Sequence, residues 1–310
     1  MNVRTEVSEK PRRVPSPIQE RFHQPPDSRR RLLLPREHGA WGMISLPFLA
    51  GMLVAGDWLH LRTVAAALAV FSIFLLREPL LFYWRQRAAA HKYKNNHFPQ
   101  PLEAQKLQEI WDARFSLWIY GLVAAISGAY LMMILPLRPL LLLGSGAALL
   151  TLLALYFTAH NYQRTPALQI AIAVGLTSSS LLSYLAGRGQ WEEPALWIWA
   201  LSAAHSSASV MVVHARLEAI LAARRPGTAS NIARRNALLA QAGLCLFLAL
   251  LVAFGRPWLA LPFLPPTALH WRELWQFRSG QVLRISMHQV GWTQLGASIA
   301  FFFLLVAVLY

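Results

Sequence analysis

The sequence predicts an all-α fold, a polytopic bundle of about nine transmembrane helices with a cytoplasmic N-terminus and an external C-terminus. Three observations lead to this prediction: the composition, the number of apolar stretches and the distribution of basic residues. Of the 310 residues, 55% are hydrophobic and only 14% are charged, whereas soluble domains carry roughly 25% charged residues. With the single cysteine Cys245, the chain cannot form an intramolecular disulfide.

Nine apolar stretches come close to the length that a membrane-spanning helix needs. A bilayer core about 30 Å thick requires roughly 20 apolar residues per helix. The eighth stretch contains three prolines, which interrupt helical hydrogen bonding, so we expect it to be kinked or partly re-entrant. The nine stretches are Ala40 to Ala55, Val64 to Phe82, Phe115 to Leu135, Pro139 to Thr158, Pro166 to Ala186, Ala195 to Val213, Ala237 to Gly255, Pro257 to Leu269 and Val290 to Leu309.

The basic residues alternate with these stretches as a nine-span topology requires. Only Arg62, Arg138, Arg188 and Arg256 fall in the loops of one side, whereas the other 25 of the 29 Lys and Arg residues fall on the side of the N-terminus. Basic loops remain cytoplasmic, so this side is predicted to face the cytoplasm. The net charge of +15 is therefore attributed to topology, and nucleic acid is not an expected partner.

Two regions differ in composition. Residues 1–33 are polar and rich in Pro, Arg and Gln, which is typical of a disordered basic tail, whereas residues 34–310 form the predicted transmembrane domain. Between the second and third spans, the connection from Arg85 to Arg114 is expected to be cytoplasmic, with an amphipathic helix near Leu102 to Trp111.

Charged motifs recur where the predicted helices meet the cytoplasm. They include "PREH" before the first span, "LLREPLLFYW" at the end of the second, "VVHARLEA" after the sixth and "ALHWRELW" after the eighth. Interfacial anchoring explains many such residues, but a glutamate at membrane depth needs a partner, and arginine is its bidentate one. The candidate ligand-binding residues are Arg36, Glu37, His38, Arg77, Glu78, His160, His205, His214, Arg216 and Glu218.

The sixth predicted span also carries an internal polar stripe. Ser202, His205, Ser206, Ser209 and Arg216 recur at helical spacing and share one face. An ionisable side chain inside a span is a candidate functional residue, although serines are also common packing residues between membrane helices. We expect the hydroxyl-rich segment at residues 177–184 to be the partner of this stripe.

Four stretches resemble the YwiC-like family of bacterial membrane proteins. They are "LPREHGAWGMISLPFLAG" (residues 34–51), "REPLL" (77–81), "VHARL" (213–217) and "LRISMHQVGWTQLGASIAF" (283–301). The resemblance implies a multi-pass protein of the bacterial cytoplasmic (inner) membrane and assigns no activity.

In architecture, the chain more weakly resembles the UbiA-type intramembrane prenyltransferases. That family implies a cytoplasmic pyrophosphate site with magnesium held by Asp-rich motifs on the second and sixth helices, because Mg²⁺ prefers carboxylate and phosphate oxygens. Here the corresponding positions hold Arg77 and Glu78, then His214 and Glu218, without an Asp-x-x-x-Asp pattern. This departure argues against a magnesium–pyrophosphate mechanism.

Guanidinium groups match phosphate and carboxylate in geometry, so the candidate residues predict binding of an anionic lipid or isoprenoid headgroup, or of a small anion. Membrane lipids are the expected partners; no cofactor or metal site is predicted, and protein partners are unknown. A lipid-modifying enzyme, a secondary transporter and a structural or assembly subunit all remain open, and the sequence does not decide whether the protein is an enzyme.

Overall fold

The computed structural model describes residues 31–35, 38–56, 60–92, 100–159, 165–224, 231–278 and 287–310. Within these residues the chain forms helices and short turns, without a strand, which confirms the predicted all-α fold class. Most of the predicted N-terminal tail lies outside the described residues.

Each of the nine predicted spans corresponds to helix in the described part of the chain. Seven spans are long and apolar enough to cross a membrane, α2 is shorter, and the Pro-rich segment is η1 followed by α10. The elements are α2 (His38–Ala55), α3 (Leu61–Lys92), α4 (Gln100–Ile134), α5 (Leu137–Ala159), α6 (Pro166–Thr177), α7 (Ser179–Arg188), α8 (Glu193–Arg224), α9 (Asn231–Ala253), η1 (Pro257–Phe263), α10 (Leu264–Arg278) and α11 (Met287–Leu309).

The expected kink of the eighth segment is a change of helix type. Residues Pro257–Phe263 form a 3-10 helix, and Leu264–Arg278 continue as an α-helix. Pro265 and Pro266 fall in the first turn of α10, where a backbone N–H has no intrahelical acceptor to lose. The prolines therefore shape the entry of this segment and leave the rest of α10 regular.

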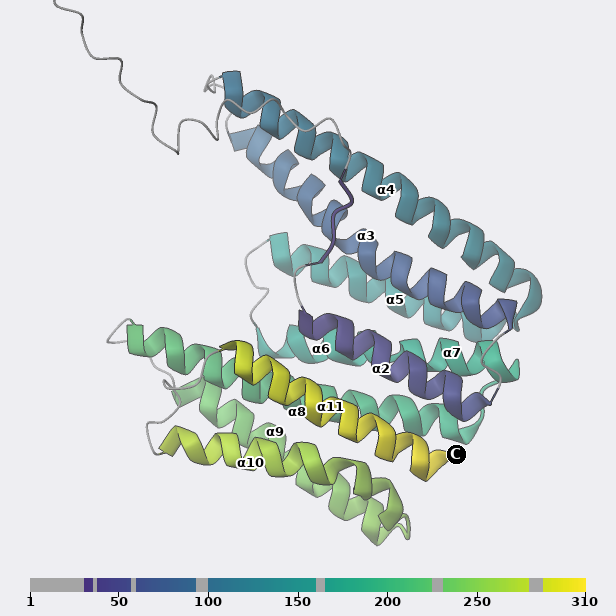
Figure 1. Cartoon of the computed structure of the whole chain (residues 1–310), viewed down its shortest axis with the longest axis vertical. Coiled ribbons are helices and arrows are strands. Elements are labelled where there is room, and N and C mark those ends of the chain that lie inside the picture. Colours follow the sequence, from purple (N-terminus) through teal and green to yellow (C-terminus); the bar gives the residue numbers. More distant parts are fainter. Residues whose placement is uncertain are drawn as a thin grey trace, which may run out of the picture.

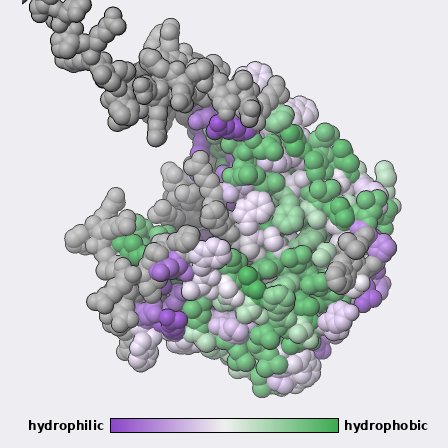
Figure 2. Space-filling view, viewed as in Figure 1, coloured by the Kyte–Doolittle hydropathy of each residue, from purple (hydrophilic) through white to green (hydrophobic). Residues whose placement is uncertain are grey.

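The helices lie side by side, and consecutive spans run in opposite directions, with α6 and α7 in line as one span (Figure 1). One end of the bundle, on the left in Figure 1, carries the start of α2 and of α11 and the end of α8 and of α10; we call it the basic end. Figure 2 shows a surface that is hydrophobic across the middle and hydrophilic toward the two helix ends. This distribution fits a bundle whose sides face lipid.

The helices differ in how much of their surface the bundle covers. In an apolar 18-residue stretch of the span formed by α6 and α7, and in one of α8, 56% of residues are buried, compared with 17% in the corresponding stretch of α4 and 11% in that of α5. The centre of the bundle is therefore built around α8 and the α6–α7 span, whereas α4 and α5 are peripheral. α3 packs along α4, and α8 packs on α6 and α9.

Small side chains allow α2 and α7 to approach closely. A Cβ at Gly51 would lie 2.3 Å from Ser183 Oγ and 2.4 Å from the Ser180 carbonyl oxygen. Ser183 and Ser180 satisfy their own hydroxyls by donating to backbone carbonyls one turn back, at 3.0 and 2.9 Å. Close approach at small residues is a common way for membrane helices to associate.

The expected connection between the second and third spans is largely helical. α3 continues to Lys92 and α4 begins at Gln100, so the predicted amphipathic helix near Leu102 to Trp111 is the first part of α4. The extended segment at residues 31–35 crosses α4. There the Leu33 N–H donates to Ser116 Oγ at 3.0 Å, and the Tyr120 hydroxyl donates to the Leu33 carbonyl at 3.2 Å.

Candidate functional site

The polar stripe predicted on the sixth span lies on α8 and is buried along its whole length. Its residues are Ser202, His205, Ser206, Ser209 and Arg216, with exposed fractions from 2% to 8%. At about 1.5 Å of rise per residue, His205 lies roughly 18 Å from the start of α8 and Arg216 roughly 34 Å. The stripe therefore extends from mid-bundle to the basic end.

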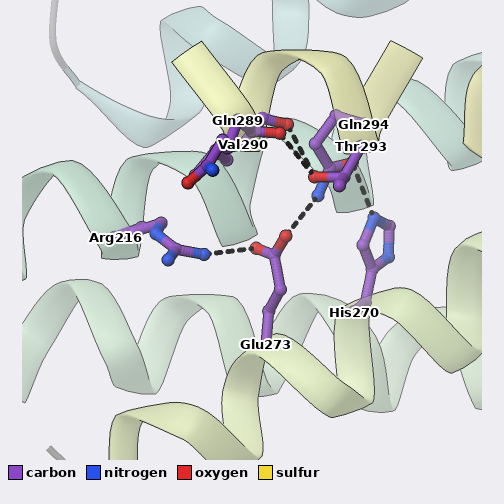
Figure 3. Close-up of polar contacts among 7 residues, drawn as sticks. All are labelled: Arg216, His270, Glu273, Gln289, Val290, Thr293 and Gln294. Carbon is purple, nitrogen blue, oxygen red and sulfur yellow. Dashed lines mark hydrogen bonds and ion pairs between the residues drawn. The ribbon is translucent and has the colours of Figure 1, made fainter. Parts of the chain in front are cut away.

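Arg216 forms a buried ion pair with Glu273 of α10. Arg216 Nη1 lies 3.6 Å from Glu273 Oε2, and both side chains are almost fully buried. On the other carboxylate oxygen, Glu273 accepts a hydrogen bond from Gln294 Nε2 of α11 at 3.4 Å. Figure 3 shows Glu273 between the arginine and the glutamine, so three helices meet at this carboxylate.

The polar contacts continue from Gln294 to His270. His270 Nε2 lies 3.4 Å from Gln294 Oε1 and 3.2 Å from Ser209 Oγ (Figure 3 draws the first). Because the amide oxygen can only accept, this contact requires the proton of His270 on Nε2. His270 is fully buried. It connects α10 to α11 and to α8.

His205 forms the deepest polar contact on the stripe. Its Nε2 lies 3.0 Å from Ser298 Oγ of α11, and its ring stacks on Phe301 with centroids 4.3 Å apart. The His205 and His270 rings are 6.4 Å apart. The contacts from Arg216 to Ser298 thus follow the α8–α11 interface into the bundle, with α10 closing it at the basic end.

Several buried polar atoms of this cluster have no hydrogen-bond partner in the described part of the structure. They include Nε and Nη2 of Arg216 and Nδ1 of His205 and of His270. In Figure 3, Nη1 of Arg216 points to Glu273 while Nη2 points away from it. A buried polar group without a partner costs about 1–3 kcal/mol, and a charged one more. The guanidinium thus retains two donors that a ligand or water could satisfy.

The start of the first span, at Trp41 and Gly42, packs near this region. Trp41 stacks edge-on against Phe74 of α3 at 5.1 Å, and a Cβ at Gly42 would lie 3.8 Å from Leu295 of α11. Leu295 follows Gln294 in the sequence. The first turn of α2 therefore contacts both α3 and the helix that carries Gln294.

The predicted site residues fall into three groups. Arg36, Glu37 and His160, and the side chain of His38, lie outside the described residues. Arg77 and Glu78 are half-buried on α3, and His214 and Glu218 are half-buried on α8, four residues apart. His205 and Arg216 are the members whose contacts with α10 and α11 define the cluster described above.

Three residues of the cluster were absent from the predicted site: His270, Glu273 and Gln294. Their motifs carry a related set of polar residues: "ALHWRELW" contains His, Arg and Glu like the predicted motifs, and "MHQVGWTQLG" contains His and two amides. The segment at residues 177–184, which was expected to be the partner of the α8 stripe, lies at the end of α6 and in α7, and both helices pack on α8. The recorded side-chain partners of His205 and Ser209 lie on α11 and α10, whereas Ser179 and Ser180 donate to backbone carbonyls.

The opposite end of the bundle holds a separate set of polar contacts. The Tyr184 hydroxyl donates to Glu192 Oε2 at 2.6 Å, and Gln190 donates to Oε1 at 3.0 Å. These two hydrogen bonds stabilise the carboxylate and lower the pKa of Glu192. Arg256 pairs with Glu193, and both are largely exposed. These contacts connect α7, the start of α8 and the loops at this end, and they are separate from the Arg216 cluster.

No group of three His, Cys, Asp or Glu side chains in the described part of the chain is placed to hold a metal ion. The buried cluster itself offers a guanidinium, a carboxylate, two imidazoles and an amide. Such a set can bind an anion and exchange protons with it.

The fold and the apolar helices define a multi-pass integral membrane protein. The model of the YwiC-like protein family matches residues 34–184, so this part of the chain is similar to YwiC-like proteins, as the "PREHGAW" motif predicted. The later stretches at residues 213–217 and 283–301 lie outside the matched segment. No curated protein and no solved structure matches the chain.

Proposed function

We propose that this protein binds a phosphate-bearing anion at the Arg216–Glu273 cluster, reached from the basic end of the bundle. By the rule that basic loops remain cytoplasmic, this end faces the cytoplasm, and the membrane is the bacterial inner membrane. The ligand is the phosphate of an anionic lipid or isoprenoid headgroup, or a free small anion.

The observation that carries the proposal is the incomplete satisfaction of Arg216. Its side chain is buried, one nitrogen faces Glu273, and Nε and Nη2 have no partner in the described part of the structure. Nε and one Nη of a guanidinium form a planar fork that matches two oxygens of a phosphate or a carboxylate. A buried cation with such a fork unsatisfied is better explained by an anion site than by packing.

Glu273 supports this proposal because it holds the guanidinium in place. A lone buried arginine would be costly, and a single carboxylate at 3.6 Å compensates part of that cost. Gln294 and His270 in turn hold the carboxylate and the amide. The four groups thus form a prearranged site in which little side-chain entropy remains to be lost on binding.

The same geometry favours binding over transport. The polar contacts end at His205 and Ser298 in mid-bundle, and beyond them α8 and α11 contribute apolar core residues such as Leu201 and Leu305. A secondary transporter would be expected to place polar groups in both halves of the membrane. A structural subunit would have no need of a buried arginine with unsatisfied donors.

Chemistry on a bound lipid would fall to Glu273 and His270. Both are within the cluster and can accept or donate a proton, so a lipid-modifying reaction without magnesium would use them as acid and base. The proposal itself concerns binding.

Native mass spectrometry of the full chain can test the proposal and identify the source of the phosphate. The protein is delipidated and offered inorganic phosphate, short-chain phosphatidylglycerol or an isoprenyl diphosphate in separate titrations. The wild type is expected to retain at least one of them, and Arg216→Gln to lose it. Arg256→Gln, which removes an exposed arginine at the opposite end, should retain it.

Two results would count against the proposal: retention of none of the three probes by the wild type, or equal retention by Arg216→Gln and the wild type. Because Arg216→Gln leaves Glu273 without its partner and could unfold, the double variant R216M/E273L serves as the second test. Apolar replacement of a whole buried ion pair is often neutral or stabilising, so this variant should fold and still fail to bind.

A further inference from the structure

A groove on the outside of the bundle lies far from the Arg216 cluster in the sequence and is independent of it. It has a volume of about 510 Å³ and lies between α3 and α4, which pack along each other (Figure 1). This volume is within the roughly 300–1,000 Å³ typical of small-ligand sites. Its lining residues are Tyr83, Arg114, Leu117, Trp118, Gly121, Leu122 and Ala125.

The floor of the groove is open because α4 has small side chains there. Gly121 and Ala125 lie four residues apart and share one face of α4. A Cβ at Gly121 would meet no atom within 4 Å, so the groove remains unfilled by α3. Leu117, Leu122 and the 77%-exposed Trp118 form apolar walls that face the membrane.

One end of the groove is polar and lies toward the basic end. Arg114 is exposed, and its guanidinium carbon lies 5.3 Å above the ring of Trp111. Arg114 is six residues after Gln108, where the apolar span of α4 begins, which corresponds to about 9 Å along the helix. Tyr83 of α3 lines the same groove. Tyrosine, tryptophan and arginine together are typical of the headgroup region of a membrane.

We infer that this groove binds one anionic glycerophospholipid of the leaflet at the basic end. Its acyl chain lies on the Gly121–Ala125 floor, and its phosphate contacts Arg114 and the Tyr83 hydroxyl. The apolar floor alone would accept any lipid tail, but the exposed cation at headgroup depth favours a net negative headgroup over a zwitterionic one. The stacking of Arg114 on Trp111 holds the guanidinium in place at this depth.

The inference can be tested by lipid retention of the full chain in native mass spectrometry, with phosphatidylglycerol and phosphatidylcholine of the same acyl chains. The wild type is expected to retain phosphatidylglycerol preferentially. Arg114→Gln should reduce that retention about fivefold, whereas Arg138→Gln, at an exposed arginine near the opposite end, should leave it unchanged. Gly121→Leu should reduce retention of both lipids, because its side chain fills the floor.

Gly128→Leu is the matched control for Gly121→Leu, since Gly128 also lies on α4 and a Cβ there would meet no atom within 4 Å. R216M/E273L should retain the groove lipid, which separates this site from the Arg216 cluster. Equal retention of the two lipids by the wild type would overturn the inference. Indistinguishable retention by Arg114→Gln and Arg138→Gln, or by Gly121→Leu and Gly128→Leu, would do the same.

Discussion

α8 and α4 are both long membrane-spanning helices, but they differ strongly in how much of each is buried in the bundle. α8 has 32 residues and α4 has 35, but 56% of an apolar 18-residue stretch of α8 is buried inside the protein, compared with 17% of the corresponding stretch of α4. α8 carries buried serines, a histidine and an arginine. α4 exposes Trp118, Leu122, Ile126 and Met133.

The comparison shows how a membrane protein separates polar chemistry from lipid contact. Lipid cannot satisfy a charge or a hydroxyl, so the polar residues of α8 need partners from α10 and α11. The apolar residues of α4 need no such cover because lipid solvates them. We therefore expect a substitution on the inward face of α8 to lower the free energy of unfolding strongly. A substitution on the outward face of α4 should change it little.

The largest effect is expected from Glu273→Ala, which leaves Arg216 buried without its carboxylate. Breaking a buried ion pair from one side typically costs about 3–5 kcal/mol, and we expect the free energy of unfolding in detergent to fall by that amount. Glu193→Ala breaks the exposed pair with Arg256 and should leave the unfolding midpoint nearly unchanged. Equal midpoints for the two variants would contradict the burial of the pair.

His205→Ala tests the interior at the deepest polar residue. The variant removes a ring that stacks on Phe301 and leaves the Ser298 hydroxyl without its partner. Together these losses should lower the free energy of unfolding by about 2–4 kcal/mol. Trp118→Ala removes a larger ring from the outward face of α4, where 77% of it is exposed, and should cost much less. A larger loss of unfolding free energy in Trp118→Ala than in His205→Ala would contradict the burial of α8.

Gly51→Ala probes the close contact between α2 and α7. The added methyl would lie within 2.4 Å of Ser183 Oγ and the Ser180 carbonyl, so α2 and α7 must move apart. We expect a loss of about 1–3 kcal/mol, the usual cost of overpacking. On α4, Gly128→Ala meets no atom within 4 Å and should be neutral or slightly stabilising, because alanine favours a helix. Thermal unfolding of both variants checks this.

The smallest effect concerns pH and the loop at the end opposite to the basic end. Hydrogen bonds from Tyr184 and Gln190 lower the pKa of Glu192 below its usual 4.5, so this carboxylate stabilises the fold above that pH and loses its contribution as the pH falls through the lowered value. The midpoint difference between the wild type and Glu192→Gln should therefore be constant near neutral pH and shrink below about pH 4. A difference that grows on acidification would contradict this sign.

The sequence predicts the fold class and the nine helical segments, because span length and the alternation of basic loops are local properties. It also predicts the buried stripe of α8 from helical spacing. It cannot predict which helices meet the stripe, since periodicity on one helix says nothing about its neighbour. For this reason Glu273 and Gln294 were missed: the helices that contain residues 177–184 do pack on α8, but the side-chain partners of the stripe come from α10 and α11. That Arg77 and Glu78 bind a ligand remains a prediction. The same holds for the candidate residues in the segments that the structure does not describe.

The central claim, that the Arg216–Glu273 pair is an anion site, is tested most directly by thermal unfolding of wild type and R216M/E273L in rising inorganic phosphate, with sodium chloride at equal ionic strength as the reference. A ligand that binds only the folded state at 100 times its Kd adds about 2.7 kcal/mol of stability. We predict that phosphate raises the wild-type midpoint above the chloride reference and leaves the double variant at that reference. Equal phosphate shifts in the two proteins, or no shift in the wild type, would contradict the claim.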